Sequence, residues 1–130
     1  MDVIEVSSQR RRQLIDITTF VREAVGSAAI EDGACHVFVP HTTAAVTINE
    51  NADPAVAEDL LTALDALVPK VRFTHAEGNS DAHLLSSLVG ASVTIPITEG
   101  DLGLGRWQGV YLLELDGPRR REVWVSCLRV

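Results

Sequence analysis

The sequence predicts an α+β fold in which one domain, residues 1–130, contains mainly antiparallel sheets. Its 130 residues are 46% hydrophobic and 22% charged, and this length and composition suit one globular domain with a single core. Strand-like and helical segments follow one another in the order ββαββααβββ. Because strands and helices do not alternate throughout, a doubly wound parallel sheet is disfavoured.

The chain begins with two strands and a helix. Residues 3–9 are extended, and residues 13–17 follow closely enough to be their hairpin partner. The apolar residues of 20–29 recur at helical spacing, and the threonine pair just before them can cap the helix.

Two further strands and a second helix come next. Residues 35–39 form one strand and residues 44–49 the other, and the short link between them allows an antiparallel hairpin. Asp53 and Pro54 then start a helix, because the Asp carboxylate can accept from free backbone N–H groups and a proline at the first helical position loses no hydrogen bond.

The last part of the chain contains a long polar loop, a short helix and three strands. The loop spans about ten residues before Ser80, which can cap a helix that ends at Gly90. A glycine-rich connection, residues 100–105, lacks the lysine and the context of a phosphate-binding loop. The strands are the extended segments 92–97, 107–115 and 122–128.

The chain carries a net charge of −7, which repels nucleic-acid backbones and anionic membranes at long range. No apolar run approaches the roughly 18 residues of a membrane helix, and the N-terminus has acidic residues where a secretory signal has basic ones. These features predict a cytoplasmic protein with no nucleic-acid or membrane partner. Of the two arginine triplets, we interpret 10–12 as a solvated loop, whereas for 119–121 a loop and a small-anion site both stay open.

Three histidines, His41, His75 and His83, stand beside polar neighbours in expected loops or at a helix start. The dipole at a helix start favours a neutral imidazole, which can bind a metal or act as a base. Together with His41 or Glu50, the pair His75 and His83 would suffice for a three-ligand zinc site with an open position. The spacing matches no strong zinc motif, so metal binding and acid–base chemistry both stay open.

A second polar cluster, Asn49, Glu50, Asn51 and Asp53, lies at the end of the fourth strand. Asp53 is interpreted as the helix cap, whereas Glu50, flanked by two amides, is placed to hold a cation or to take a proton. His41 and Glu50 are about 30 Å apart along a straight strand, too far for one small-molecule pocket. Either the chain bends, or the two ends serve different sites, or they meet across a subunit interface.

The two cysteines, Cys35 and Cys127, each lie within an apolar strand-like run. Neither has a local basic neighbour that would stabilise a thiolate. We interpret them as buried thiols rather than as a disulfide or a metal pair.

Three separated stretches resemble the YjbQ family, also called UPF0047: HTTAAVTINENADP, HAEGNSDAHLLSSLVG and LGLGRWQGVYLLELDGPRRREVWV. The resemblance runs in the same order over nearly the whole chain. It implies a homotrimer of α+β subunits, each with a β-sandwich-like core and helices packed outside, and a polar cleft near the subunit boundaries. The matching positions are His41, Thr42, Asn49, Glu50, Asn51, Asp53, His75, Asn79, His83, Trp107, Gln108, Glu114, Asp116, Gly117, Arg119 and Arg121.

The same resemblance implies a secondary thiamine-phosphate synthase activity, which condenses a hydroxymethylpyrimidine pyrophosphate with a thiazole phosphate and releases pyrophosphate. The metal would be Mg²⁺ on the pyrophosphate or Zn²⁺ on the three histidines, His41, His75 and His83. The catalytic residues implied are His41, Glu50, Asp53, His75 and His83. The substrate-binding residues implied are Thr42, Asn49, Asn51, Asn79, Arg119 and Arg121.

Two other functions stay open from the sequence. One is a metal-dependent hydrolase of a phosphorylated metabolite, which would hold zinc on the histidines and turn over without a thiazole partner. The other is a non-enzymatic trimeric ligand-binding protein, which would bind its ligand without turnover. All three expectations share a homotrimer and a small phosphorylated metabolite as partners.

Overall fold

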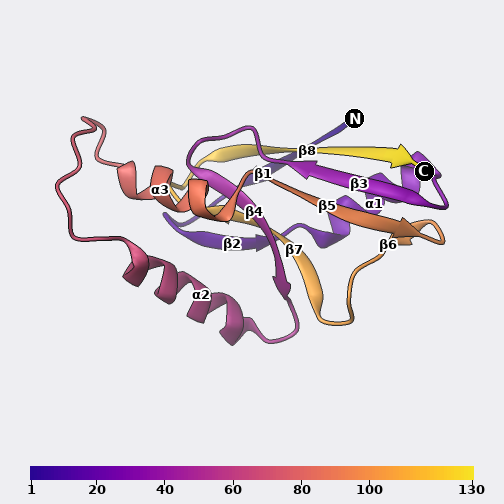
Figure 1. Cartoon of the computed structure of the whole chain (residues 1–130), viewed down its shortest axis with the longest axis horizontal. Coiled ribbons are helices and arrows are strands. Elements are labelled where there is room, and N and C mark those ends of the chain that lie inside the picture. Colours follow the sequence, from indigo (N-terminus) through magenta and orange to yellow (C-terminus); the bar gives the residue numbers. More distant parts are fainter.

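The structure, a computed structural model, describes residues 1–130 as three helices and eight strands (Figure 1). The expected α+β class and element order are confirmed, with one short strand, β6, added inside the glycine-rich connection. The elements are β1 (Asp2–Ser7), β2 (Gln13–Asp16), α1 (Thr18–Ala28), β3 (Gly33–Phe38), β4 (Ala44–Glu50), α2 (Pro54–Leu67), α3 (Ser80–Val89), β5 (Ser92–Thr98), β6 (Asp101–Leu102), β7 (Gln108–Glu114) and β8 (Arg120–Arg129).

The strands form two antiparallel sheets. The larger has the order β1-β8-β3-β5-β6 and the smaller the order β2-β7-β4. Figure 1 shows β8, β3 and β5 side by side above the smaller sheet. The first and last strands of the chain, β1 and β8, are neighbours in the larger sheet, with Ser7 opposite Arg120.

The sequence predicted that β1 and β2 form a hairpin and that β3 and β4 form another, and both predictions are wrong. β1 pairs with β8, whereas β2 pairs with β7 in the other sheet. Likewise β3 pairs with β5 and β8, whereas β4 pairs with β7. The physical reason is that consecutive strands face each other across the core: Val37 of β3 and Val46 of β4 belong to one buried cluster. Each link therefore carries the chain from one sheet to the other.

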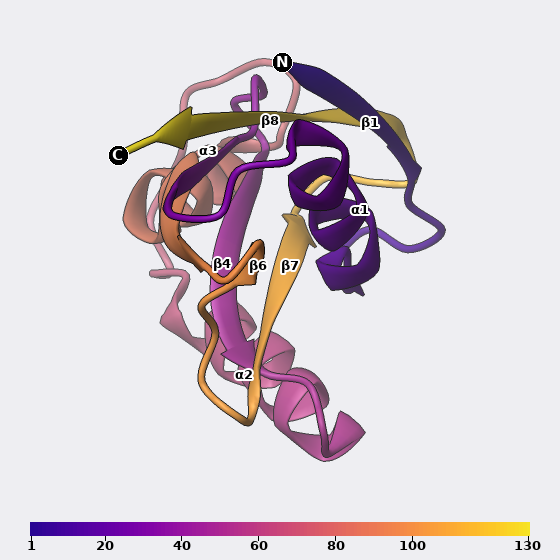
Figure 2. The ribbon, with the colours of Figure 1, turned by 90° about the vertical axis from the view of Figure 1, so that its right-hand side faces the viewer.

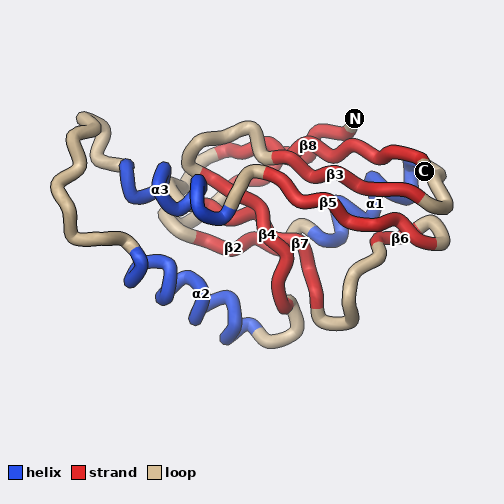
Figure 3. Tube along the Cα trace, in the orientation of Figure 1, coloured by secondary structure: helices blue, strands red, loops and turns tan.

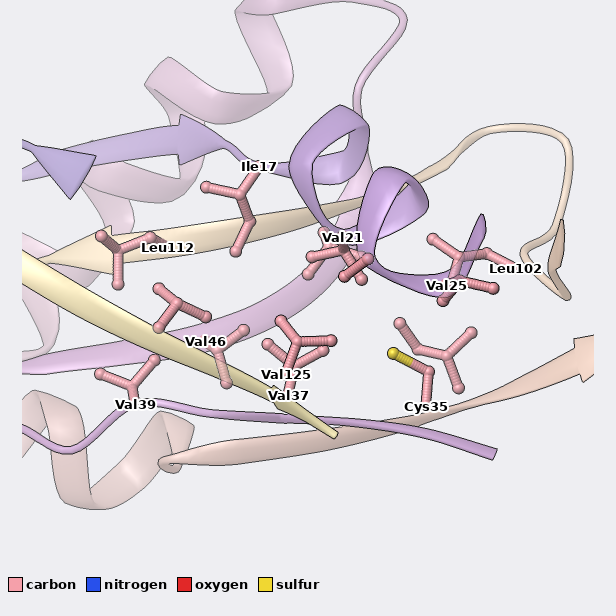
Figure 4. Close-up of a cluster of buried hydrophobic side chains, with 14 of the residues drawn as sticks. Ile17, Val21, Val25, Cys35, Val37, Val39, Val46, Leu102, Leu112 and Val125 are labelled. Carbon is pink, nitrogen blue, oxygen red and sulfur yellow. The ribbon is translucent and has the colours of Figure 1, made fainter. Parts of the chain in front are cut away.

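The main core lies between the two sheets and α1. It contains eighteen buried residues, and α1 contributes Val21, Ala24 and Val25. Figure 4 shows Val21 and Val25 pointing toward side chains of the strands, and Figure 2 shows α1 lying beside the strands at one side of the molecule. Burying one such aliphatic side chain stabilises the fold by about 1.5–3 kcal/mol, so this cluster dominates the packing.

A smaller core lies under α2 and α3, which occupy the other end of the molecule (Figure 3). Leu61 of α2 and Leu85 of α3 pack there against Leu113 and Leu115. Since Leu112 belongs to the main core and Leu113 to the smaller one, β7 is buried on both faces. Crossing a membrane would need a longer and more apolar helix than any of the three.

The helix cap expected at Asp53 is confirmed. Its Oδ1 accepts a hydrogen bond of 2.9 Å from the backbone N–H of Ala55, and Pro54 is the first helical residue. α1 uses a different cap: the Asp16 carboxylate accepts from both the backbone N–H and the hydroxyl of Thr18. Here the carboxylate supplies the acceptor that we expected from a threonine.

Candidate functional site

His41 lies in the link between β3 and β4, where the chain passes from one sheet to the other. Its Nε2 accepts a hydrogen bond of 2.9 Å from the backbone N–H of Glu122 at the start of β8. Burial, followed by the nearby Arg121 guanidinium, lowers the pKa of His41 below its ordinary 6.5. The imidazole is therefore neutral near pH 7 and carries its proton on Nδ1.

A polar cavity of about 350 Å³ lies between the His41 link and α3. His41 and Thr42 line one side, and His83, Ser86 and Ser87 of α3 line the other. The Ser86 hydroxyl donates to the Thr42 carbonyl at 2.6 Å, which holds the helix against the link. Since both serine hydroxyls donate their protons to backbone carbonyls, their lone pairs are left to accept from a ligand.

A second polar cavity, of about 230 Å³, lies on the other side of His41. Glu5, Arg120, Arg121 and Glu122 line it with His41, and no hydrophobic residue contributes. His41 is thus shared by the two cavities, one rich in hydroxyl groups and the other in charged groups.

Behind this second cavity lies a buried ion pair between Arg121 and Glu114, exposed by 4% and 0%. The guanidinium donates from Nε and Nη2 to the Glu114 carboxylate at 2.9 and 2.5 Å, and from Nη2 to the hydroxyl and carbonyl of Thr43. Ser8 donates to the same carboxylate at 2.6 Å. Burial pushes the pKa of Glu114 up, but the hydrogen bonds from Arg121 and Ser8 outweigh it and hold the pKa below its ordinary value.

Arg121 therefore differs from the open phosphate-binding arginine that the sequence suggested. Most of its donors are used within the chain. The remaining terminal nitrogen, Nη1, makes no hydrogen bond to the chain and is not fully buried, and Arg121 lines the second cavity. Only this one nitrogen can meet a ligand there.

Sequence reasoning did not give Glu114 a role in the site. The available signal was its position: a carboxylate in the apolar run of β7, between Leu113 and Leu115, must find a charged partner if it is buried.

Asn79 and Arg119 belong to a neighbouring polar network around Asp116. The Asn79 amide donates to the Asp116 carboxylate at 2.9 Å, and Arg119 donates to the same carboxylate at 2.8 Å and to the Asp116 carbonyl at 2.7 Å. Asn79 is buried, and its Oδ1 has no partner. Asn79 thus holds the turn after β7 against the start of α3, Arg119 closes that turn on itself, and substrate binding by them stays a prediction.

His75 joins the site at its edge. It lies in the long loop before α3, and its ring meets that of His83 edge to face with centroids 5.6 Å apart. Its Nε2 is 4.0 Å from a carboxylate oxygen of Glu77, which is exposed. The structure therefore brings together His41 and His83 across one cavity, with His75 behind His83.

Within one chain, the second polar cluster, residues 49–53, lies away from the three histidines. Glu50 lies opposite Gln108 at the far end of β4, whereas Ala44, next to the His41 link, lies opposite Glu114. Asp53 caps α2, and the Asn51 amide donates to Asp16 at 3.2 Å. β4 does not fold back, so the catalytic role expected for Glu50 and Asp53 beside the histidines could arise only from another copy of the chain.

The three histidines do not fit a metal within one chain. No group of three or more His, Cys, Asp or Glu side chains is arranged to hold a metal ion. His41 already uses Nε2 as an acceptor for the Glu122 N–H. Zn²⁺ on His41, His75 and His83 stays a prediction that needs ligands or movements beyond this arrangement.

The family model and the known relatives that match this chain point to the same family. The model of the family described as UPF0047 protein YjbQ-like matches residues 2–130. UPF0047 protein MJ1081 of Methanocaldococcus jannaschii is 50% identical over 95% of this chain and 91% of its own. UPF0047 protein YugU of Bacillus subtilis is 41% identical over 98% of each chain.

Solved structures agree closely with the fold. A protein of the YjbQ/UPF0047 family from Clostridium acetobutylicum superposes with a TM-score of 0.95 at 48% identity, covering 98% of this chain and all of the other. A YbjQ-like protein of unknown function from Sulfolobus solfataricus gives a TM-score of 0.94 at 38% identity, covering 99% and 96%.

These findings correct the functional expectation. The thiamine-phosphate synthase activity taken from the resemblance is wrong as a conclusion, because the relatives carry only UPF0047 family names and the Sulfolobus solfataricus protein is described as being of unknown function. The same names give no support to the hydrolase or to the trimeric ligand-binding protein. What the match over residues 2–130 and the close relatives establish is that the chain belongs to the YjbQ-like UPF0047 family.

Proposed function

We propose that the protein is an enzyme that binds a small phosphorylated metabolite around His41 and uses the imidazole of His83 for acid–base chemistry on it. The observation that carries the proposal is that His41 lines both polar cavities. A ligand bound across His41 would place its charged group in the second cavity and its uncharged polar part in the first.

The phosphate belongs in the second cavity. Arg121 offers the free Nη1 there, Arg120 offers the nitrogens that its ion pair with Glu5 at 2.6 Å leaves free, and His41 can donate from Nδ1. Guanidinium groups bind phosphate more strongly than neutral donors do, since both partners are charged. The uncharged polar part belongs in the first cavity, where the Ser86 and Ser87 oxygens can accept from hydroxyl or amino groups.

His41 is suited to position the ligand as a hydrogen-bond donor. Its Nε2 already accepts the Glu122 N–H and its Nδ1 carries the proton, so the neutral ring has no free lone pair for a second proton. Burial with Arg121 keeps the ring neutral. His83 faces the same cavity from α3 and supplies the acid–base group.

We propose further that three copies assemble in the cytoplasm. Association is supported by large apolar side chains that one chain leaves in solvent, among them Val3, Phe20, Trp107 and Leu128, whereas the number of copies and the compartment are the expectations drawn from the sequence. Light scattering coupled to size-exclusion chromatography gives the mass directly. A monomer at micromolar concentration would contradict this assembly without touching the proposal on His41.

The main proposal is tested by ³¹P NMR with a panel of phosphorylated metabolites, including inorganic phosphate, which follows binding and turnover in one experiment. We expect His41→Gln and His83→Gln to lower turnover by at least tenfold, and His41→Gln to weaken phosphate binding about tenfold, the loss of one charge-assisted hydrogen bond. Repeating the panel with Mg²⁺, with Zn²⁺ and with a chelator shows whether a metal contributes.

The matched control is His36→Gln. His36 lies on β3, stacks with Phe38 at 6.4 Å between ring centroids and lines neither cavity. Its replacement should leave binding and turnover unchanged. If His36→Gln and His41→Gln behaved alike, or if no phosphorylated compound bound the wild-type protein, the proposal would be wrong.

A further inference from the structure

The two cysteines, 92 positions apart in the sequence, are direct neighbours in the larger sheet. In the antiparallel pairing of β3 with β8, Cys35 lies opposite Cys127. Directly opposed residues project from the same face of a sheet, so both thiols point toward the main core. The expectation of buried thiols holds for Cys35, which is fully buried, whereas Cys127 is half-buried.

The hydrogen-bonding pattern between β3 and β8 places this pair at a position that suits a disulfide bond. Opposed pairs alternate between hydrogen-bonded and non-hydrogen-bonded, and the Val130 N–H bonds to the Asp32 carbonyl, which makes that pair a hydrogen-bonded one. Cys35 and Cys127 lie three pairs further along, so they form a non-hydrogen-bonded pair. Cα atoms in such pairs are about 4.5 Å apart, inside the range that a disulfide spans.

Only Cys127 is accessible from solvent. It lines a cavity of about 190 Å³ with Met1 of the N-terminus and Ser27 of α1, among others. Cys35 has no exposed surface, and its sulfur lies among the core side chains in Figure 4. Burial and then the neighbouring Cys127 raise the pKa of Cys35 to about 12, so this group stays a thiol until a partner sulfur is bonded to Cys127.

We propose that Cys35 and Cys127 are a reversible disulfide site, which a low-molecular-weight disulfide reaches through Cys127 and which links β3 covalently to β8. The Cys127 thiolate attacks one sulfur of the small disulfide, and the first small thiolate leaves. Cys35 then attacks the Cys127 sulfur, and the second small thiolate leaves and takes up the proton of the Cys35 thiol. The two cysteines are oxidised, and the small disulfide is reduced to two thiols.

The test uses the full chain and hydroxyethyl disulfide as the probe, followed by intact mass measurement and by alkylation of free thiols after unfolding. We expect the wild-type protein to lose two hydrogen atoms, to keep no adduct, to leave no alkylatable thiol and to recover its mass on reduction. The melting temperature of the oxidised form should rise by roughly 10 °C, because the bond closes a loop of about 90 residues.

Two single variants separate the roles of the thiols. Cys35→Ser should keep one hydroxyethylthio adduct on Cys127, because no second thiol displaces it. Cys127→Ser should stay unmodified while folded, because Cys35 is out of reach. Far-UV circular dichroism confirms that each variant is folded before it is treated, and the wild-type masses alone decide the case if one is not.

The proposal is overturned if the wild-type protein keeps a stable adduct, if it stays unmodified, or if the disulfide forms between two chains. It is also overturned if folded Cys127→Ser reacts as readily as Cys35→Ser, since the route would then not run through Cys127.

Discussion

β4 connects two polar regions that are built in different ways. The histidine end, His41 with the Arg121 and Glu114 pair behind it, depends on contacts between residues far apart in sequence, such as Ser8 with Glu114. The Glu50 end, residues 49–53, combines contacts within a few residues, such as Asn49 with the Glu50 N–H, with the longer-range bond from Asn51 to Asp16. Fixed side chains over polar cavities favour chemistry, and the histidine end has two such cavities, whereas of residues 49–53 only Asn49 lines a cavity, a mostly apolar one.

The largest expected difference between the two ends comes from removing one carboxylate at each. Glu114→Ala leaves the Arg121 charge buried and should lower the free energy of unfolding by about 3–5 kcal/mol. Glu50→Ala removes a side chain without an ion pair and should change it by less than about 0.5 kcal/mol.

Urea denaturation of both variants measures this difference. The double variant Glu114→Leu with Arg121→Met removes both charges and should lose less than Glu114→Ala alone. Equal losses for Glu114→Ala and Glu50→Ala would show that the buried pair is not what distinguishes the histidine end.

Acid should lower the free energy of unfolding through the histidine end, as the removal of the Glu114 carboxylate does. The pKa of folded Glu114 is lowered, so its stabilising contribution is complete above its ordinary value of 4.5 and is lost as the pH falls through the folded value. Glu114→Gln should therefore flatten the dependence of unfolding free energy on pH below about 4.5, compared with the wild-type protein. Denaturation series between pH 3 and 7 compare the slopes, and parallel curves for Glu114→Gln and wild type would contradict the assignment.

A glycine at each end allows a finer comparison. A Cβ on Gly117 would collide with the Arg10 carbonyl and lie 2.6 Å from the Ser8 hydroxyl, whereas the three nearest atoms to a Cβ on Gly109 all belong to the Asn51 side chain, with its Cβ at 2.8 Å. Asn51 can turn its amide away but its Cβ moves only with the backbone, so both variants should be destabilised: Gly117→Ala, which meets a backbone carbonyl and the buried network, by about 1–3 kcal/mol, and Gly109→Ala by less. Thermal unfolding of the two variants ranks them, and the reverse order would mean that the turn after β7 is more adaptable than the contacts indicate.

The smallest effect is expected for the helix cap at the Glu50 end. Asp53→Ala removes the acceptor for the Ala55 N–H and should lower the free energy of unfolding by about 1 kcal/mol. Turnover of any substrate found for the histidine end should not change, because within one chain β4 separates Asp53 from His41. A loss of turnover in Asp53→Ala with retained stability would instead indicate that another copy brings the two ends together.

Sequence patterns predicted the local parts of this structure. Helical spacing, the Asp53-Pro54 start and the strand segments depend on neighbours in the chain, and the structure confirms them. Strand pairing was not accessible in the same way, because a short link fits a hairpin and a crossing between sheets equally well. The pairings of β1 with β8 and β2 with β7 are decided by packing across the core.

The site was predictable in part for the same reason. His41 and His83 were found by residue type and by their polar neighbours, and they do meet at one cavity. Glu50 lies away from them because β4 is not bent, which removes the first of the three geometries left open and leaves two separate sites or a meeting across a subunit interface. The opposition of Cys35 and Cys127 depends on the register of β3 with β8, which no pattern within either strand encodes.

The neighbouring positions of β1 and β8 have a consequence for how the protein is made. Of the eight strands, β1 is made first, but the only strand that it pairs with, β8, is made last. Its open hydrogen-bonding edge therefore stays unpaired until β8 is made, and pairings between such distant segments form slowly. Ser8 and Arg121 meet the same Glu114 carboxylate only after β8 has been made, so the surroundings of His41 are complete only then.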